Sequence, residues 1–153
     1  MFKLCLFLAF CAALVFYHFE TLSNPKLETL GAGYFRIYSR EDVCSPLVTN
    51  RRSIATGFIY VTRSENADEL RNKFTHIYGE SIILDEYMPK HEVLRALGYR
   101  AVLQQNNHMM RITYAYSGRG RDFITENNNR INLQIASRNG VTTVGWPVIL
   151  GSF

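Results

Sequence analysis

The stretch RINLQIASRNGVTTVGWPVIL, residues 130–150, constrains the fold more than any other part of the chain. Two runs of alternating apolar residues flank Asn139-Gly140. Such a dipeptide is the strongest short signal of a β-hairpin closed by a two-residue type I′ loop. The loop fixes the register, so that Arg138 pairs with Val141 and the pairing continues outward one residue at a time. A slip by one residue would expose the whole apolar set, and the register is therefore firmly specified.

This register sorts the side chains of the hairpin onto two faces. One face receives Ile131, Leu133, Ile135, Val144, Trp146 and Val148, and the other receives Asn132, Gln134, Ala136 and Arg138. We therefore expect Trp146, the only tryptophan, to anchor the core rather than to stack on a ligand. Pro147 has no N–H to give to Asn132, so we expect the ladder to break or bulge there, helped by Gly145.

The N-terminus, MFKLCLFLAFCAALVFYHFE, has one basic residue, Lys3, before an uncharged apolar run from Leu4 to Tyr17. As a helix this run spans about 21 Å, which is shorter than the roughly 30 Å hydrocarbon layer. Its length favours a secretory signal, but the cleavage site is poorly defined, so an uncleaved anchor stays open. We assign residues 1–17 to a signal peptide or membrane anchor, 18–32 to a linker and 33–153 to a single domain.

Segments rich in aromatic and β-branched residues predict the strands of this domain. Ile112, Tyr114 and Tyr116 alternate with Arg111 and Thr113, which is typical of a sheet with one face in water. In addition to the closing hairpin, we expect strands at 34–39, 53–63, 80–88, 99–105, 108–117 and from residue 122, with a loop over 40–52.

Two helices are predicted between these strands. The first, over 65–79, places on one face Ala67, Leu70, Phe74 and Ile77. It is expected to begin at a capping box at Asn66 and to end at Gly79. The second runs from Pro89 to Gly98. The pattern favours an α+β fold, a largely antiparallel sheet with two helices packed on one face.

Charge is distributed unevenly along the chain. Thirteen of the 17 basic residues are arginine. The sequence from Arg95 onward contains seven arginines but only two acidic residues, Asp122 and Glu126. This excess suits an anionic partner, although a solvated sheet face is the simpler explanation and the one we favour. The candidate binding residues are Arg111, Arg119, Arg121, Arg130 and Arg138.

The sequence offers little support for catalysis or for a cofactor. The four histidines and three cysteines form no metal-binding spacing, and no longer glycine fingerprint accompanies the SGRGRD turn, so we expect no metal and no cofactor. An envelope enzyme using Cys44 and His91 is an alternative, but nothing in the sequence places the two together. Cys44 is the only cysteine that would remain after cleavage, and we expect it to be buried and inert.

A nucleic-acid partner is a further alternative, because the candidate arginines could lie along one face of the sheet among Tyr114 and Tyr116. Alternation, however, puts Arg111 and these tyrosines on opposite faces of the sheet. Export also argues against a genomic partner, so we expect no nucleic acid to bind.

Several segments resemble the YwmB family of exported proteins from spore-forming Firmicutes: INLQIASR and TTVGWPVILGS at the end, ENADELRNKF in the first predicted helix, and the apolar start. That family is similar in fold to the TATA-box-binding protein. The resemblance implies a curved antiparallel sheet backed by helices, preceded by a signal or anchor helix. The family has no established activity, so no catalytic residue is carried over, and a DNA-binding fold does not imply DNA binding.

Taken together, these features predict a non-enzymatic binding module of the bacterial cell envelope, either secreted or anchored to the cytoplasmic membrane. The expected partner is an envelope protein or an anionic wall polymer, with membrane contact through the N-terminal segment if it is uncleaved. The alternatives are the Cys44/His91 enzyme and a nucleic-acid-binding protein.

Overall fold

The computed structural model describes residues 24–106, 110–119 and 122–149 of the chain. The expected signal or anchor, residues 1–17, lies outside these ranges. The described strands are β1 (Gly33–Ser39), β2 (Asn50–Ile54), β3 (Gly57–Arg63), β4 (Gly79–Leu84), β5 (Arg100–Asn106), β6 (Arg111–Tyr116), β7 (Ile124–Glu126), β8 (Asn129–Ile131), β9 (Leu133–Arg138) and β10 (Val141–Trp146). The helical elements are the 3₁₀ turns η1 (Leu27–Leu30) and η2 (Ser64–Asn66) and the α-helices α2 (Ala67–Arg71) and α3 (Lys90–Leu97).

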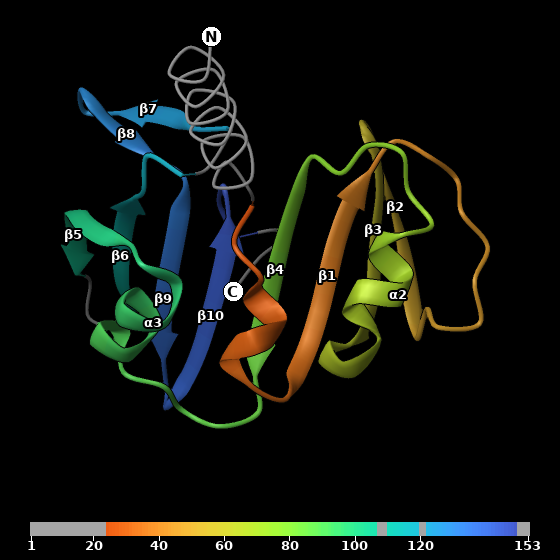
Figure 1. The fold of residues 1–153 in the computed structure, drawn as a ribbon, viewed down its shortest axis with the longest axis horizontal. Helices are drawn as coiled ribbons and strands as arrows, with labels where there is room; N and C mark the ends of the chain where they lie inside the picture. Colours follow the sequence, from red (N-terminus) through yellow and green to blue (C-terminus); the bar gives the residue numbers. More distant parts are fainter. Residues whose placement is uncertain (1–23, 107–109, 120–121, 150–153) are drawn as a thin grey trace, which may run out of the picture.

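Eight of these strands form one antiparallel sheet, in the order β2-β3-β1-β4-β10-β9-β6-β5 (Figure 1). The strands β7 and β8 pair separately as a small antiparallel ribbon. The α+β class and the antiparallel sheet expected from the sequence are confirmed. The sheet is continuous because β10, the last described strand, pairs with β4 and so joins the two halves of the chain.

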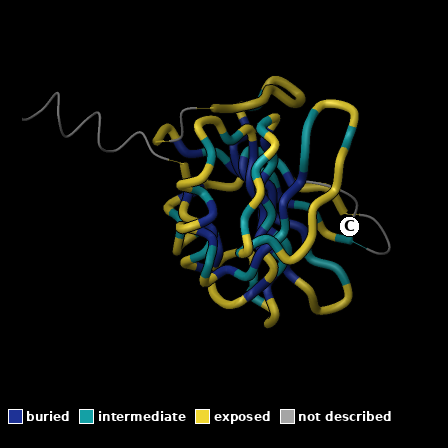
Figure 2. Tube along the Cα trace, turned by 90° about the vertical axis from the view of Figure 1, so that its right-hand side faces the viewer, coloured by how far each residue is buried: buried dark blue, intermediate teal, exposed yellow. Residues whose placement is uncertain are grey.

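The core lies between one face of the sheet and the short helices in front of it (Figure 1). In β1 the buried residues Phe35 and Ile37 alternate with Tyr34, which is 49% exposed. Leu70 of α2 and Val93 of α3 are fully buried against this helix-covered face. Figure 2 shows the buried residues running through the middle of the molecule, with exposed segments forming its outline.

The core also includes a segment that was expected to be linker. Leu27 and Leu30 of η1 are 0% and 5% exposed and belong to the same apolar cluster. The reason lies in the spacing of these two leucines, which puts both on one side of a 3₁₀ turn. Within the segment 18–32 that was expected to be linker, the described turn η1 therefore packs against the core of the domain.

The helix α3 confirms the sequence prediction at both ends. Pro89 precedes its first residue in an extended conformation, and Gly98 ends it with φ 71° in the left-handed region. Glycine adopts that conformation without the steric cost that other residues meet.

The first predicted helix is much shorter than expected, because α2 spans only Ala67–Arg71. The residues after it bond to β1 and its neighbouring loop instead of to one another. The Glu41 carboxylate accepts hydrogen bonds from the backbone N–H groups of Thr75 and His76, and Tyr78 N–H donates to the Tyr38 carbonyl. Gly79 then begins β4 rather than ending a helix.

The strand expected over 53–63 is a hairpin of β2 and β3, which turns at Ala55-Thr56. The hydroxyl of Tyr38 donates to the Thr56 carbonyl at 3.0 Å and holds this turn. Gly57 approaches β1 so closely that a Cβ there would lie 2.5 Å from the Ser39 carbonyl oxygen. The expected loop over 40–52 therefore ends at Asn50, where β2 begins.

The closing hairpin has the predicted register, from Arg138–Val141 to Gln134–Gly145. The ladder ends at Gln134–Gly145, one pair before the break expected at Pro147, and the chain turns back so tightly that a Cβ on Gly145 would lie 2.4 Å from the Ile149 Cα. Trp146 is 1% exposed and belongs to the core, as predicted.

The other face of this hairpin is not open to water at its far end. Asn132 is fully buried because its side chain accepts from Ser117 N–H and donates to the Ser117 carbonyl. Gln134 is also buried, and its side-chain oxygen accepts from Ile149 N–H at 2.9 Å. Within the described ranges, no helix is long and apolar enough to cross a membrane.

Candidate functional site: a basic cavity at the polar corner of the sheet

The helix-covered face of the sheet changes character along β5, β6 and β9. In its middle, Ala115 pairs with Leu133 and both are fully buried. Toward one end of these strands the same face becomes polar. We call this region the polar corner, and it consists of Gln104 and Thr113 in one row and Asn106, Arg111 and Ser137 in the next. Polar residues thus occupy positions that elsewhere in the sheet form the core.

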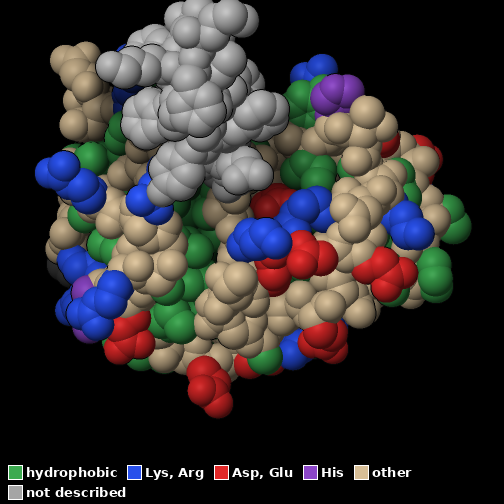
Figure 3. Space-filling view, in the orientation of Figure 1, with side chains coloured by type: hydrophobic (Ala, Val, Ile, Leu, Met, Phe, Trp, Pro, Cys, Tyr) green, Lys and Arg blue, Asp and Glu red, His purple; other side chains and the backbone are tan. Residues whose placement is uncertain are grey.

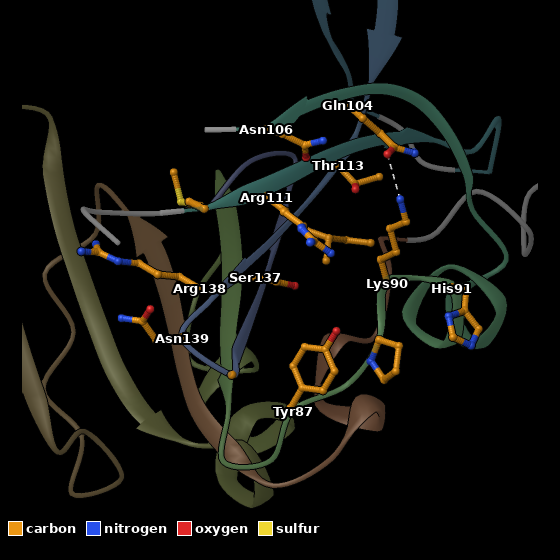
Figure 4. Close-up of a pocket in the computed structure, with 14 residues that line it drawn as sticks. Tyr87, Lys90, His91, Gln104, Asn106, Arg111, Thr113, Ser137, Arg138 and Asn139 are labelled. Atoms are coloured by element: carbon orange, nitrogen blue, oxygen red, sulfur yellow. Dashed lines mark hydrogen bonds between the residues drawn. The ribbon is translucent and has the colours of Figure 1, made fainter. Parts of the chain in front are cut away.

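The helix α3 leaves the polar corner uncovered because it has only eight residues, a length of about 12 Å. A cavity of about 830 Å³ opens between the corner, the first turn of α3, the segment before it and the Asn139-Gly140 turn (Figure 4). We call it the basic cavity. It is lined by Tyr87, Pro89, Lys90, His91, Gln104, Asn106, Met110, Arg111, Thr113, Ile135, Ser137, Arg138, Asn139 and Gly140.

The charges in this cavity are all of one sign. Lys90 and Arg111 extend into its centre, and none of the lining residues is aspartate or glutamate (Figure 4). Lys90 Nζ donates to Gln104 Oε1 at 2.8 Å. The guanidinium of Arg111 has no hydrogen-bond or ion-pair partner among the described residues. Because two cations share the space with no carboxylate, an anion entering it gains attraction from both.

Three neutral polar side chains of the corner are also without partners among the described residues. Thr113 is 4% exposed, yet within the described part of the chain its hydroxyl makes no hydrogen bond, and the same holds for the side chains of Ser137 and Asn106. A hydroxyl on a residue as buried as Thr113 is usually hydrogen-bonded, whereas Ser137 is half-buried and Asn106 is exposed. These groups can therefore bond a molecule that enters the cavity.

One wall of the cavity is formed by Tyr87, which is 56% exposed and whose hydroxyl points toward the centre (Figure 4). Its position is set by the next residue. The Thr142 hydroxyl donates to the Met88 carbonyl at 2.8 Å and accepts from Met88 N–H at 3.1 Å. Thr142 is fully buried in β10, so these bonds attach the segment before α3 to the closing hairpin.

Two of the five arginines proposed from the sequence line the cavity, and they differ in direction. Arg111 points into it, whereas Arg138 points away from Lys90 and Arg111 (Figure 4). The register explains the difference. Arg111 pairs with Ser137 on the helix-covered face, and Arg138, the next residue along β9, therefore lies on the opposite face of the sheet. Arg138 also lines a smaller cavity of about 340 Å³ on that other face, with Arg36, Val141 and Ile149.

The other proposed arginines lie elsewhere. Arg119 follows the far end of β6, and Arg130 lies in the β7–β8 ribbon with its guanidinium 4.7 Å from the centre of the Phe123 ring (Figure 1). Neither lines the basic cavity. Arg121 lies outside the described residues.

The residues of the alternative enzyme are not brought together. Cys44 lies in the loop before β2, at one side of the molecule, and His91 lies in α3 at the other (Figure 1). Cys44 is exposed, so the expectation that it is buried is wrong. The loop that carries it lies outside the sheet and gives its side chain no apolar cover. Among the described residues, no group of three or more His, Cys, Asp or Glu could hold a metal ion.

Sequence reasoning missed most of the cavity. Tyr87, Lys90 and Ser137 were not proposed, although a predicted helix start at Pro89 placed Lys90 in the first turn of α3. Alternation also placed Thr113 on the same face as Arg111, two residues away. These signals were present, but only the pairing of β5, β6 and β9 shows that the residues meet.

Comparisons with protein families, with curated proteins and with solved structures find no match for this chain. The fold and the cavity alone describe this chain: it is an α+β protein with an antiparallel sheet and a basic cavity at one corner of that sheet. The resemblance to the YwmB family stays a prediction.

Proposed function

We propose that this protein is a non-enzymatic binding module of the bacterial cell envelope and that it binds an anionic ligand in the basic cavity. The observation that carries the proposal is the cation pair of Lys90 and Arg111 in a cavity lined by no carboxylate. A guanidinium remains charged at every physiological pH and presents several donors in fixed geometry, which suits carboxylate and phosphate oxygens.

The proposed location rests on the sequence of the N-terminus. A short apolar run after a single lysine supports export, with the domain either released or held at the cytoplasmic membrane. In that location the abundant anions are wall polymers and acidic surface proteins. We favour a wall polymer, because the unpartnered hydroxyl and amide groups beside Arg111 suit a ligand with many oxygens.

The test is binding of the full chain to isolated cell walls, compared with the same walls after their phosphate-rich polymers have been removed. We expect sedimentation with intact walls only, and weaker binding as salt is raised, since salt screens exposed charges. Cell fractionation accompanies this test, and a purely cytosolic protein would overturn the proposed location.

Two matched double variants locate the binding site. Lys90→Gln/Arg111→Gln and Arg119→Gln/Arg130→Gln each remove two positive charges, the first inside the cavity and the second at the other end of the strands. We expect the first to lose at least about tenfold in affinity and the second to stay within about threefold of the wild type. Equal losses in the two variants would mean that the net charge binds the polymer and would overturn the assignment to the cavity.

A further inference from the structure

The basic cavity contains more than charge, and its other groups indicate which anion it accepts. We propose that its ligand is the phosphate ester of a polyhydroxylated unit, a sugar phosphate or polyol phosphate. This inference rests on the proposed function, because it assumes that an anion binds at Lys90 and Arg111, and it adds the chemical class of that anion.

The size of the cavity argues against an inorganic anion alone. A volume of about 830 Å³ lies in the range of roughly 300–1,000 Å³ that small organic ligands occupy in proteins. A phosphate group in contact with Lys90 and Arg111 would leave most of this space unfilled. A ligand that carries its phosphate on a larger unit would also meet the other walls.

Those walls are mainly neutral and polar. Asn106, Arg111 and Ser137 form a row across three adjacent strands. Neighbouring strands are about 4.8 Å apart, so the row extends for about 10 Å. Gln104 and Thr113 form the next row on the same face. The corner thus presents one cation within a set of amides and hydroxyls.

Hydroxyl groups of a sugar or polyol both donate and accept hydrogen bonds, and this corner offers both functions. The hydroxyls of Thr113 and Ser137 donate and accept, and the amide of Asn106 does so through its two ends. The amide nitrogen of Gln104 remains a donor while its oxygen accepts from Lys90. Thr113 is the strongest indication, because the residue is only 4% exposed and its hydroxyl, which still reaches the cavity, has no partner among the described residues.

The exposed ring of Tyr87 forms the wall opposite the polar corner (Figure 4). An aromatic ring presents an apolar, electron-rich face, against which the C–H groups of a sugar ring can pack. Thr142 bonds both the N–H and the C=O of Met88, so the backbone beside Tyr87 is attached to the closing hairpin before a ligand arrives. A nucleobase also stacks on aromatic rings, so the titration below includes a nucleotide as a competing ligand.

Calorimetric titration of the full chain with five small molecules tests the inference. The molecules are glucose 6-phosphate, sn-glycerol 3-phosphate, inorganic phosphate, glucose and adenosine 5′-monophosphate. We expect glucose 6-phosphate and sn-glycerol 3-phosphate, the two esters without a nucleobase, to bind at least about tenfold more tightly than inorganic phosphate, and glucose to bind more weakly than either of them. The nucleotide is expected to bind no more tightly than inorganic phosphate.

Variants separate the two parts of the ligand. Arg111→Gln is expected to weaken the esters and inorganic phosphate alike. Thr113→Val and Ser137→Ala are expected to weaken the esters by about fivefold and to leave the affinity for inorganic phosphate unchanged. Each variant is first shown to retain the circular dichroism spectrum and the unfolding midpoint of the wild type.

Three results would overturn the inference. Equal affinity for inorganic phosphate and both esters would refute the hydroxyl-binding role while leaving anion binding, and so the proposed function, intact. Tighter binding of the nucleotide would favour a stacked base over a sugar. Failure of all four phosphate compounds and of the wall polymer to bind would refute the inference and the proposed function together.

Discussion

Two arginines on the helix-covered side of the molecule, Arg71 in α2 and Arg111 in β6, meet opposite surroundings. Arg71 donates to Glu80 at 2.7 Å and to Glu28 at 2.9 Å, and it also pairs with Asp68. Arg111 has no carboxylate partner among the described residues. Acidic and basic side chains adjoin over η1 and α2 (Figure 3). The same side chain thus serves as a structural link in one region and as an unpaired cation in the other.

The difference follows from what each arginine connects. Arg71 joins η1, α2 and β4, and its partner Glu80 is only 2% exposed. Burial lowers the pKa of Arg71, but hydrogen bonds to Glu80 and Glu28 outweigh it and raise the pKa above its ordinary value. Arg111 joins nothing and faces the basic cavity. Removing Arg71 should therefore affect folding, and removing Arg111 should affect binding.

The largest effect is expected for Arg71→Met. It leaves the buried Glu80 carboxylate without its cation, a change that typically costs about 3–5 kcal/mol. Urea unfolding followed by circular dichroism measures the loss. The double variant Arg71→Met/Glu80→Gln should recover part of it, because the uncompensated charge is gone. If Arg71→Met unfolds at the wild-type urea concentration, the network is not structural.

A smaller loss is expected for Thr142→Val, which keeps the shape of the side chain and removes the hydroxyl bonded to Met88. The half-buried N–H and C=O of Met88 lose their partner, at a cost of about 1 kcal/mol. The affinity for the anionic ligand should fall as well, because Tyr87 is no longer held. Thr143→Val, at the neighbouring position on the opposite face, is the control and should retain both properties.

The third prediction concerns pH. Burial raises the pKa of Glu80 above its ordinary value near 4.5, with Glu28 and Asp68 adding to the effect and Arg71 opposing it. Between the pKa of Glu80 in the unfolded chain and its higher pKa in the folded protein, only the folded protein keeps the Glu80 carboxyl protonated. The free energy of unfolding therefore falls as pH rises through this window. Glu80→Gln should remove this slope, at most about 1.4 kcal/mol per pH unit.

Glu41 provides the comparison of opposite sign for this measurement. Backbone hydrogen bonds from Thr75 and His76 lower its pKa. The contribution of Glu41 to stability is therefore fully present above the pKa that this carboxyl has in the unfolded chain. It is lost as pH falls through the lower pKa that the carboxyl has in the folded protein. Unfolding free energies of Glu80→Gln and Glu41→Gln, measured across acidic pH, should deviate from the wild type in opposite directions. Parallel deviations would contradict the assignment.

The smallest effect on folding is expected for Arg111→Met. Because no described residue bonds to its guanidinium, the free energy of unfolding should stay within about 0.5 kcal/mol of the wild type. Binding to isolated walls should nevertheless fall. A large loss of stability would show that Arg111 has a structural role like that of Arg71.

The closing hairpin could be predicted from the sequence because its turn and its alternation are both local. The same applies to α3, where Pro89 and Gly98 mark the ends. The first predicted helix was too long because the competing bonds, from Glu41 to Thr75 and His76, come from residues more than 30 positions away. The β2–β3 turn was missed because Ala55-Thr56 is not a usual hairpin dipeptide.

The cavity depends on contacts that no local pattern contains. Arg111 and Lys90 become neighbours only because β5 pairs with β6 and α3 packs back over them. Tyr87 is placed by Thr142, which lies 54 positions from Met88. Alternation placed Arg111 on the face away from Tyr114 and Tyr116, and the structure confirms this. Alternation alone could not predict that β5 and β9 are the strands that pair with β6 and complete this face.

The register shift in β5, between Ala101 and Leu103, has a consequence for how copies of this chain meet one another. β5 is an edge strand of the sheet, and a regular edge invites another chain to extend the sheet and begin an aggregate. The shift adds a residue at Val102 and moves the free N–H and C=O groups out of phase with an incoming regular strand. The edge beside the cavity thus discourages self-assembly while the adjoining side chains stay accessible to a ligand.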